Sequence, residues 1–459
     1  MNDKRFSPSR GFIVAFISLI ALAVTGAISL GASGSTAAMV AFLLAQVVVI
    51  SIVIWQACDP FADAAQYIGM KFNIPGSVRG ATLDAIASSM PELFSGIFFV
   101  VVAIISVQDA QELATESSEG FGAVVATCAG SAVYNMILIP AACALVIARA
   151  RKSQPTIEIA PNVITRDGMW FLICEVILIV FLFQNSVTWW MAVVFIGIYF
   201  MYIAWLYMDT RSFRRALSGV SEQIQGFTGD ITTDLVTEKF KQANLPYNKA
   251  RIIEVRNRLI DQRAGDEEEE ETLEEAEFLF GLGRVKLGPV SSWMVILVST
   301  LVAAASCYWL VEVTYSFSKV LEIPIFFVAV IIAAAASSVP DTFLSVGAAL
   351  RGDDDGAVAN AFGSNIFDIC ICLSIPLLVA SYLNGWGPVA LVQEDGEPLP
   401  GLVGMRILLA VFTMVTLLIM WHNLQLTKRK AWILVGLYAL FVLYAVLGSM
   451  GYSLDQIMN

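Results

Sequence analysis

The sequence predicts an all-α polytopic membrane protein of eleven transmembrane helices. One helix precedes two halves of five helices, which are related as inverted-topology repeats and joined by a cytoplasmic central loop. Three observations predict this fold class: the composition, a row of long apolar segments, and a pattern that occurs twice. Apolar residues make up 58% of the 459 positions and charged residues 14%, with a mean hydropathy of +0.74. Soluble domains average about 45–50% apolar and about 25% charged residues, so most of this chain is expected to avoid water.

Eleven apolar runs are long enough to cross a hydrocarbon core of about 30 Å, which takes roughly 20 helical residues. They lie at about 11–31, 38–57, 80–106, 119–148, 168–184, 188–208, 290–314, 323–350, 355–381, 403–423 and 431–449. The runs lack the period-two alternation of barrel strands, and backbone groups in lipid must be satisfied internally, so we predict helices. The first run starts like a secretory signal, but it exceeds the roughly 7–15 residues of a signal core. We therefore predict a retained helix.

The runs divide the chain into four parts. Residues 1–37 hold an extra N-terminal transmembrane helix, residues 38–208 the first half, and residues 290–459 the second half. Residues 209–289 form a polar segment that contains the acidic run 266–271. We predict a solvated acidic loop for this segment, and a calcium-sensing or partner-binding loop is the alternative.

The basic residues predict the orientation, because Lys and Arg concentrate in cytoplasmic loops. Threading the eleven helices from a cytoplasmic N-terminus places all but two of the 27 Lys and Arg on one side. The exceptions are Lys319 and Arg406. We therefore expect an integral protein of a plasma or inner membrane, with its N-terminus in the cytoplasm and its C-terminus outside.

Composition also restricts the partners. The net charge of −12 comes from a few acidic stretches, and no basic patch suits nucleic acid. The seven cysteines lie in or beside apolar runs and form neither a disulfide framework nor a CxxC pair. We therefore expect buried thiols and a lipid bilayer as the main partner, and the sequence leaves the oligomeric state open.

A short pattern occurs once in each half of the chain. The first copy reads Ala87-Ser88-Ser89-Met90-Pro91-Glu92, and the second reads Ala336-Ser337-Ser338-Val339-Pro340-Asp341. Each is followed by a matched segment, Gly130-Ser131-Ala132-Val133-Tyr134-Asn135 and Gly363-Ser364-Asn365-Ile366-Phe367-Asp368. In this topology the first helix of motif region 80–148 would cross the membrane from the cytoplasm to the outside. The first helix of motif region 331–381 would cross it in the opposite direction. Inverted repeats of this kind place a binding site near the midplane between the halves.

The spacing predicts four oxygen-rich helix faces. The pairs Ser88/Glu92, Ser131/Asn135, Ser337/Asp341 and Ser364/Asp368 each stand four residues apart, so each pair shares a helix face. Pro91 and Pro340 also free the carbonyl groups of Ala87 and Ala336. Such oxygens suit a hard cation such as calcium, which takes about six to eight of them. His422 is the only histidine, so transition metals are disfavoured.

Glu92, Asp341 and Asp368 impose an electrostatic condition. An ionised carboxylate near the membrane centre costs about 2.5–3.5 kcal/mol even on the lenient insertion scale. The central turns of the four helices contain no Lys or Arg, so the compensating charge must come from protons or bound cations. Carboxyl groups that merely link helices are the alternative, but this alternative leaves the symmetry of the set unexplained.

These segments resemble the two alpha-repeats of the calcium:cation antiporter superfamily, and they look most like the potassium-dependent sodium/calcium exchangers. The matches are Gly80-Ala81-Thr82, the segments from Gly130 to Asn135 and from Ser338 to Asp341, and Gly363 to Ile369 with Pro376 beyond it. They cover about a quarter of the chain, and elsewhere only the helix order agrees. The resemblance implies an antiporter, not an enzyme, that exchanges Ca²⁺ for Na⁺ by alternating access, with K⁺ as an additional candidate ion.

The resemblance also implies, position by position, a set of cation ligands. They are Ser88, Ser89, Glu92, Ser131, Asn135, Ser337, Ser338, Asp341, Ser364 and Asp368. Glu92 and Asp341 would be the principal calcium carboxylates. Asp368 stands where potassium-dependent members carry aspartate and animal potassium-independent exchangers carry asparagine, although some prokaryotic exchangers also carry aspartate. The chain departs from the family by Ala87 and Ala336 in place of glycine, and by the added acid Asp84.

Three other functions stay open at this point. A calcium/proton exchanger would neutralise the same carboxylates with protons. An intramembrane aspartyl protease would use two membrane aspartates, but the Gly-x-Gly-Asp motif of such families is absent. A cation channel would show conductance rather than saturable counter-transport.

Overall fold

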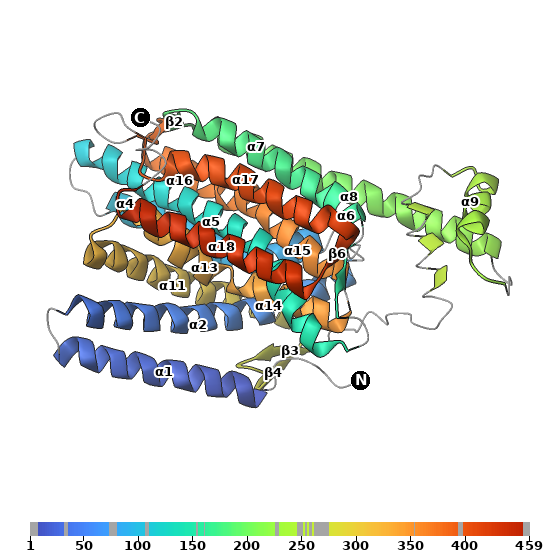
Figure 1. The fold of residues 1–459 in the computed structure, drawn as a ribbon, viewed down its shortest axis with the longest axis horizontal. Coiled ribbons are helices and arrows are strands. Elements are labelled where there is room, and N and C mark those ends of the chain that lie inside the picture. Colours follow the sequence, from blue (N-terminus) through green and yellow to red (C-terminus); the bar gives the residue numbers. More distant parts are fainter. Residues whose placement is uncertain are drawn as a thin grey trace.

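The computed structural model describes residues 8–31, 35–72, 80–105, 110–152, 155–159, 161–224, 229–245, 251–252, 255–256, 259–260, 275–352, 354–392 and 398–452. Among these residues the chain is mostly α-helical, as the sequence predicts. The long helices run roughly parallel in one bundle, and a unit that contains helix α9 projects from one end of it (Figure 1).

The first part of the bundle contains α1 (Pro8–Gly31), α2 (Thr36–Lys71), the π-helical turn η1 (Gly80–Asp84), α4 (Ala85–Ile105) and α5 (Ala110–Ala150). Next come β1 (Ile157–Glu158), α6 (Pro161–Val163), the π-helical turn η2 (Ile164–Gly168), α7 (Met169–Leu182), β2 (Ser186–Val187) and α8 (Trp189–Ile224). Long apolar stretches with few charged residues account for these helices, whose backbone groups are satisfied within each segment.

The second part of the bundle repeats this order. It contains α11 (Pro289–Leu321), α12 (Ile325–Val328), the π-helical turn η3 (Ala329–Ala333), α13 (Ala334–Ser337), α14 (Val339–Arg351) and α15 (Asp354–Phe367). Next come the π-helical turn η4 (Asp368–Cys372), α16 (Ser374–Leu383), β5 (Val389–Ala390), α17 (Leu402–Trp421), the 3₁₀ turn η5 (His422–Leu424), β6 (Gln425–Leu426) and α18 (Lys428–Ser449).

Nine helices in the described part of the chain are long and apolar enough to cross a membrane, and a bent pair, Ile325–Ser337 with Val339–Leu350, gives a tenth span. These ten coincide with ten of the eleven segments predicted from sequence. The eleventh segment, 168–184, coincides with α7, which has only 14 residues. It continues backwards without a gap through η2 and α6 to Pro161.

Two short antiparallel strand pairs join loops of the two halves. Strand β1 pairs with β6, with Ile157 opposite Leu426, and β2 pairs with β5, with Val187 opposite Val389. In each pair one strand comes from the first half and the other from the second half. The loops that link α5 to α8 are thereby hydrogen-bonded to those that link α16 to α18.

Part of the segment between the halves forms a small folded unit. Helix α8 continues as far as Ile224, and α9 (Thr233–Gln242) packs against it around a small apolar core that includes Val220, Val236 and Phe240. Arg251 pairs with Asp209 at the base of this unit. Apolar residues at helical spacing explain the folding, because they bury a common face. The acidic run 266–271 lies outside the described residues.

A β-hairpin connects this segment to the second half. Strands β3 (Glu275–Phe278) and β4 (Gly283–Lys286) pair beside α1 and α2 (Figure 1). The ring of Phe280 at the hairpin turn lies edge-on against Trp55 of α2, at 5.5 Å between centroids. The Phe280 amide donates to Gln56 Oε1 at 2.7 Å, so the hairpin is fixed to the membrane helices by both packing and hydrogen bonding.

Candidate functional site

The repeated segments meet in the interior of the bundle. Helices α4 and α5 carry the first copies, and α13, α14, α15 and η4 carry the second copies. All ten residues named above as ligands are fully buried, each with 0% of its surface exposed. The structure therefore brings side chains from distant parts of the chain into one polar cluster inside an apolar bundle.

Each repeat contributes the same internal hydrogen bond. In the first repeat, the Ser131 hydroxyl donates to Glu92 Oε1 at 3.3 Å. In the second repeat, the equivalent Ser364 hydroxyl donates to Asp341 Oδ1 at 2.6 Å. Both bonds join the proline-containing helix to the helix that follows it, which is the pairing that the inverted repeat predicts.

Further contacts cross from one repeat to the other. The Ser131 and Ser338 hydroxyls are 2.8 Å apart, and Ser131 also lies 3.0 Å from Asp368 Oδ2. The Ser338 hydroxyl donates to Glu92 Oε1 at 3.2 Å, and Asn135 Nδ2 lies 3.5 Å from Asp341 Oδ2. Eight of the ten residues thus share a single hydrogen-bonded cluster, which Ser88 joins through Ser364 at 3.4 Å.

The two remaining residues, Ser89 and Ser337, border this cluster, Ser89 beside Asp368 and Ser337 beside Glu92. The Ser337 hydroxyl donates to the Ala334 carbonyl of its own helix at 3.2 Å. The Ser89 hydroxyl has no hydrogen-bond partner among the described residues, and its carbonyl accepts a contact of 3.5 Å from the Cys372 thiol.

The cluster contains buried oxygens that nothing in the described part of the chain satisfies. They are Glu92 Oε2, Asn135 Oδ1, Asp368 Oδ1 and Ser89 Oγ. A buried polar atom without a partner costs about 1–3 kcal/mol, and more when it is charged. Carboxylate, amide and hydroxyl oxygens that converge without partners are the donor set that a hard cation prefers.

Carboxylates alone would not hold the ion. In the described part of the chain, no three His, Cys, Asp or Glu side chains converge closely enough to bind a metal by themselves. The serine hydroxyls and the Asn135 amide would therefore have to complete the coordination, as the mixed pattern in the sequence implies.

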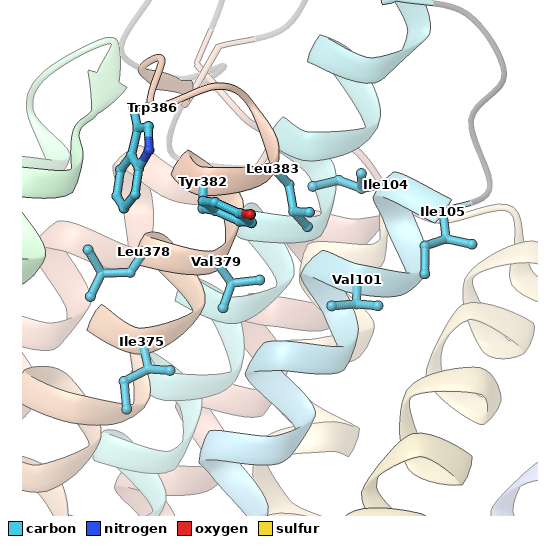
Figure 2. A pocket seen from close by; sticks show the side chains of 9 residues that line it. All are labelled: Val101, Ile104, Ile105, Ile375, Leu378, Val379, Tyr382, Leu383 and Trp386. Atoms are coloured by element: carbon cyan, nitrogen blue, oxygen red, sulfur yellow. The ribbon is translucent and has the colours of Figure 1, made fainter.

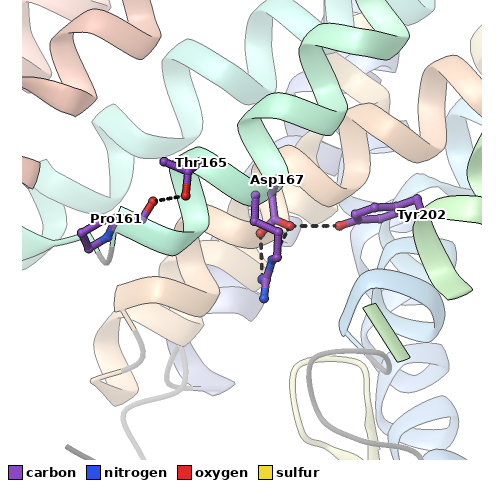
Figure 3. A network of polar contacts seen from close by, with 5 residues as sticks. Pro161, Thr165, Asp167 and Tyr202 are labelled. Carbon is purple, nitrogen blue, oxygen red and sulfur yellow. Dashed lines mark hydrogen bonds and ion pairs between the residues drawn. The ribbon is translucent and has the colours of Figure 1, made fainter. Parts of the chain in front are cut away.

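Asp167 is a buried carboxylate of the same bundle that, unlike the three acids of the cluster, is paired with a cationic side chain. Asp167 of η2 is 1% exposed, and Arg166 binds both its oxygens, at 2.8 and 2.9 Å. The Tyr202 hydroxyl adds a third contact at 3.3 Å (Figure 3). By contrast, none of the ion pairs of the described residues involves Glu92, Asp341 or Asp368. A mobile cation or a proton would therefore have to neutralise the negative charge of these three carboxylates.

The π-helical turns η1 and η3 occupy equivalent places in the two repeats. Turn η1 ends four residues before Ser88, and η3 ends four residues before Ser337. A π-helical turn inserts one residue into a helix and is frequent at functional sites. No sequence pattern marks these turns, although Gly80 begins the first of them.

The proline segments differ between the repeats. The second copy breaks at Ser338, where the two helix segments are bent by 40°. The first copy runs through Pro91 as one helix from Ala85 to Ile105. Because both copies contain the proline, the proline alone does not determine whether the helix breaks.

Two further residues of the site were not among the predicted ligands. Asn365 is fully buried and donates to the Ala132 carbonyl of the other repeat at 3.2 Å. Cys372 lies against Ser89. Asn365 follows Ser364 in the repeated motif and was within reach of sequence reasoning, whereas nothing in the sequence marked Cys372.

A surface cavity of about 530 Å³ lies away from this cluster, between α4 and α16 (Figure 2). Its lining is apolar, and the hydroxyl of Tyr382 and the indole of Trp386 are its only side-chain polar groups. It lacks the oxygen donors of a cation site, which places the candidate chemistry in the buried cluster.

The fold and the buried oxygen cluster define an integral membrane protein of the transporter type. The chain belongs to the sodium/calcium exchanger protein family, whose model matches residues 42–208 and 291–447. Its relatives include the mouse sodium/potassium/calcium exchanger 3, which is 26% identical over 208 residues, and the human sodium/potassium/calcium exchanger 4, which is 29% identical over 147 residues. The aligned regions cover 43% and 32% of this chain but only 29% and 20% of those relatives.

Solved structures show the same fold. An H⁺/Ca²⁺ exchanger, CAX, superposes with a TM-score of 0.57 at 13% identity, covering 97% of this chain and 93% of that one. Native YfkE superposes with a TM-score of 0.55 at 13% identity, covering 95% and 100% of the two chains. These similarities establish the fold, and the ion coupling of this chain has to be argued from its own residues.

Proposed function

We propose that this protein is a secondary antiporter that moves Ca²⁺ across a membrane in exchange for Na⁺, with the ten buried residues named above as its ion ligands. The observation that carries the proposal is the set of three fully buried carboxylates, Glu92, Asp341 and Asp368, which form no ion pair with any described residue. Glu92 and Asp368 each also keep one oxygen without a hydrogen-bond partner among the described residues. Glu92 and Asp341 would be the main calcium ligands.

The coupling follows from electrostatics. Moving an empty, doubly or triply charged site through the membrane interior is unfavourable, because each uncompensated carboxylate costs several kcal/mol. Ca²⁺ or a set of Na⁺ ions neutralises the same carboxylates, so only loaded states change access. Exchange rather than leakage is the expected outcome of a site with several acids and no fixed cation.

The proposed topology completes the transporter. Eleven spans, with α6 to α7 as the fourth span of the first half, would put residues 1–37, 38–208 and 290–459 in the membrane and residues 209–289 in the cytoplasm. The N-terminus would be cytoplasmic and the C-terminus outside, in a plasma or inner membrane. The orientation rests on the distribution of Lys and Arg between the loops.

Transport in liposomes tests the proposal. The purified chain is reconstituted in sodium-loaded vesicles, and calcium-45 uptake is followed after dilution into sodium-free buffer, with and without potassium. Uptake that requires internal sodium supports the proposal. Uptake that needs a pH gradient and ignores sodium would replace it with calcium/proton exchange, since protons can neutralise the same carboxylates. Calcium conductance without counter-transport would identify a channel.

Asp368 is proposed to set the response to potassium. The relatives named above are sodium/potassium/calcium exchangers, and Asp368 is the third carboxylate, 3.0 Å from Ser131. Asp368→Asn removes one negative charge and leaves Glu92 and Asp341 in place. We expect it to reduce potassium activation of calcium uptake several-fold while sodium-driven uptake persists, measured in the same vesicles over a potassium titration. Potassium activation equal to that of the unsubstituted chain would contradict this role.

A further inference from the structure

The two repeats are packed differently at equivalent glycines beside the site. Gly130 of α5 lies directly against the backbone of η3, because an ideal Cβ at this position would come within 2.2 Å of the Val330 carbonyl oxygen. Gly363 holds the equivalent position in α15, since each glycine immediately precedes the repeat's serine, Ser131 or Ser364. An ideal Cβ on Gly363 meets no atom of the described residues within 4 Å, although this glycine is buried.

The hydroxyl groups show the same difference. Next to the close contact, Ser131 lies 2.8 Å from Ser338 of the other repeat. The equivalent pair is Ser364 with Ser89, and here the Ser89 hydroxyl has no hydrogen-bond partner among the described residues. Ser364 instead reaches Ser88, at 3.4 Å. One of two symmetry-related junctions is therefore closed, and the other is open.

The helices around each junction agree with this assignment. At the closed junction, α5 packs on η3, and the helix that follows η3 is bent by 40° at Ser338. At the open junction, α15 lies beside η1, the equivalent π-helical turn, and the following helix α4 is unbroken. The same residues in the two repeats thus adopt two local arrangements within one structure.

We propose that the Gly130–η3 and Gly363–η1 junctions are the two alternating closures of the site, and that Gly363 is kept free of a side chain so that η1 can approach it in the opposite state. In that state the Gly363 junction would adopt the packing now seen at Gly130, and the Gly130 junction would open. Packed interfaces favour discrete arrangements over continuous deformation. This inference rests on the proposed antiport, because alternating closure has a function only if the site is loaded from both sides.

Gly363→Ala separates this role from a structural one. The described state has room for the added methyl group, so the protein is expected to fold and to keep its thermal stability, and Ala favours a helix over Gly. The opposite state would force that methyl group against the η1 backbone, where overpacking is unfavourable. We therefore expect calcium exchange in liposomes to fall by about tenfold or more while equilibrium calcium-45 binding is retained.

Gly197→Ala is the matched control. Gly197 is an exposed residue of α8, also with nothing within 4 Å of an ideal Cβ among the described residues, whereas the residues of the cluster are fully buried. It should leave exchange unchanged. If the unsubstituted chain exchanges calcium and Gly363→Ala exchanges as fast as Gly197→Ala, the proposed closure is wrong.

Hydrogen-exchange mass spectrometry gives a readout that does not depend on which ions are exchanged. Amide protection reports local opening, so peptides covering η3 should be more protected than those covering η1. Gly363→Ala should widen this difference, because it disfavours the state in which η1 is packed. If Gly363→Ala leaves the difference in amide protection between η3 and η1 unchanged, the inference is wrong, even if no calcium transport is detected. If the difference in protection widens but no calcium transport is detected, only the proposed antiport is contradicted.

Discussion

Asp341→Asn is expected to abolish sodium-driven calcium uptake. Asp341 is fully buried and receives the Ser364 hydroxyl at 2.6 Å, so its position is fixed before an ion arrives. Loss of a buried charged partner costs about 2–5 kcal/mol, and about 3 kcal/mol lowers affinity roughly a hundredfold. Glu92→Gln should have the same effect, because Glu92 lies at the equivalent position and retains an unsatisfied oxygen.

Stability measurements distinguish this loss from misfolding. A ligand at 100 times its Kd stabilises a folded protein by about 2.7 kcal/mol, so saturating calcium should raise the melting temperature of the unsubstituted chain. Both variants should fold, because each replaces a buried carboxylate with a neutral isostere, and both should lose the calcium-dependent shift. Near-normal calcium flux in either variant would refute the ligand assignment.

Gly130→Ala is the second large effect that we expect. Its Cβ would overlap the Val330 carbonyl oxygen at 2.2 Å and the Ala334 Cβ at 2.7 Å. The first of these is backbone, which cannot rotate away. Overpacking costs typically about 1–3 kcal/mol, more than the roughly 0.5–1 kcal/mol that Ala gains over Gly in a helix. We expect a lower melting temperature and strongly reduced exchange.

The matched control for this variant is Gly436→Ala. Gly436 lies in α18 and has open space around its ideal Cβ, so the melting temperature should stay the same or rise. If Gly130→Ala is as stable and as active as Gly436→Ala, then the close approach of α5 to η3 is not required.

The sequence predicted the parts of this molecule that follow from periodicity and composition. Ten of the eleven predicted spans coincide with helices or with the bent pair, because each long apolar run has one way to satisfy its backbone in lipid. All seven cysteines are buried and free, as expected. The two copies of the motif could be recognised in the sequence because a serine and a carboxylate or amide recur four residues apart, which places each pair on one helix face.

Other features depend on tertiary contacts that no single segment encodes. Pro91 and Pro340 are equivalent in sequence, yet only the second helix breaks. Hydrogen bonds such as Ser131 to Ser338 join residues 207 positions apart, and their geometry depends on how the repeats pack. The small core around Val236 and Phe240 likewise forms from short segments that are separate in sequence.

The length of α8 has a structural consequence. This helix runs unbroken for 36 residues, about 54 Å at 1.5 Å per residue, from the bundle into the projecting unit with α9. Inside the bundle, its Tyr199 ring lies edge-on against Phe367, with centroids 5.5 Å apart, and Phe367 immediately precedes Asp368. One continuous helix therefore links the α9 unit, outside the bundle, to the residue that immediately precedes the third carboxylate.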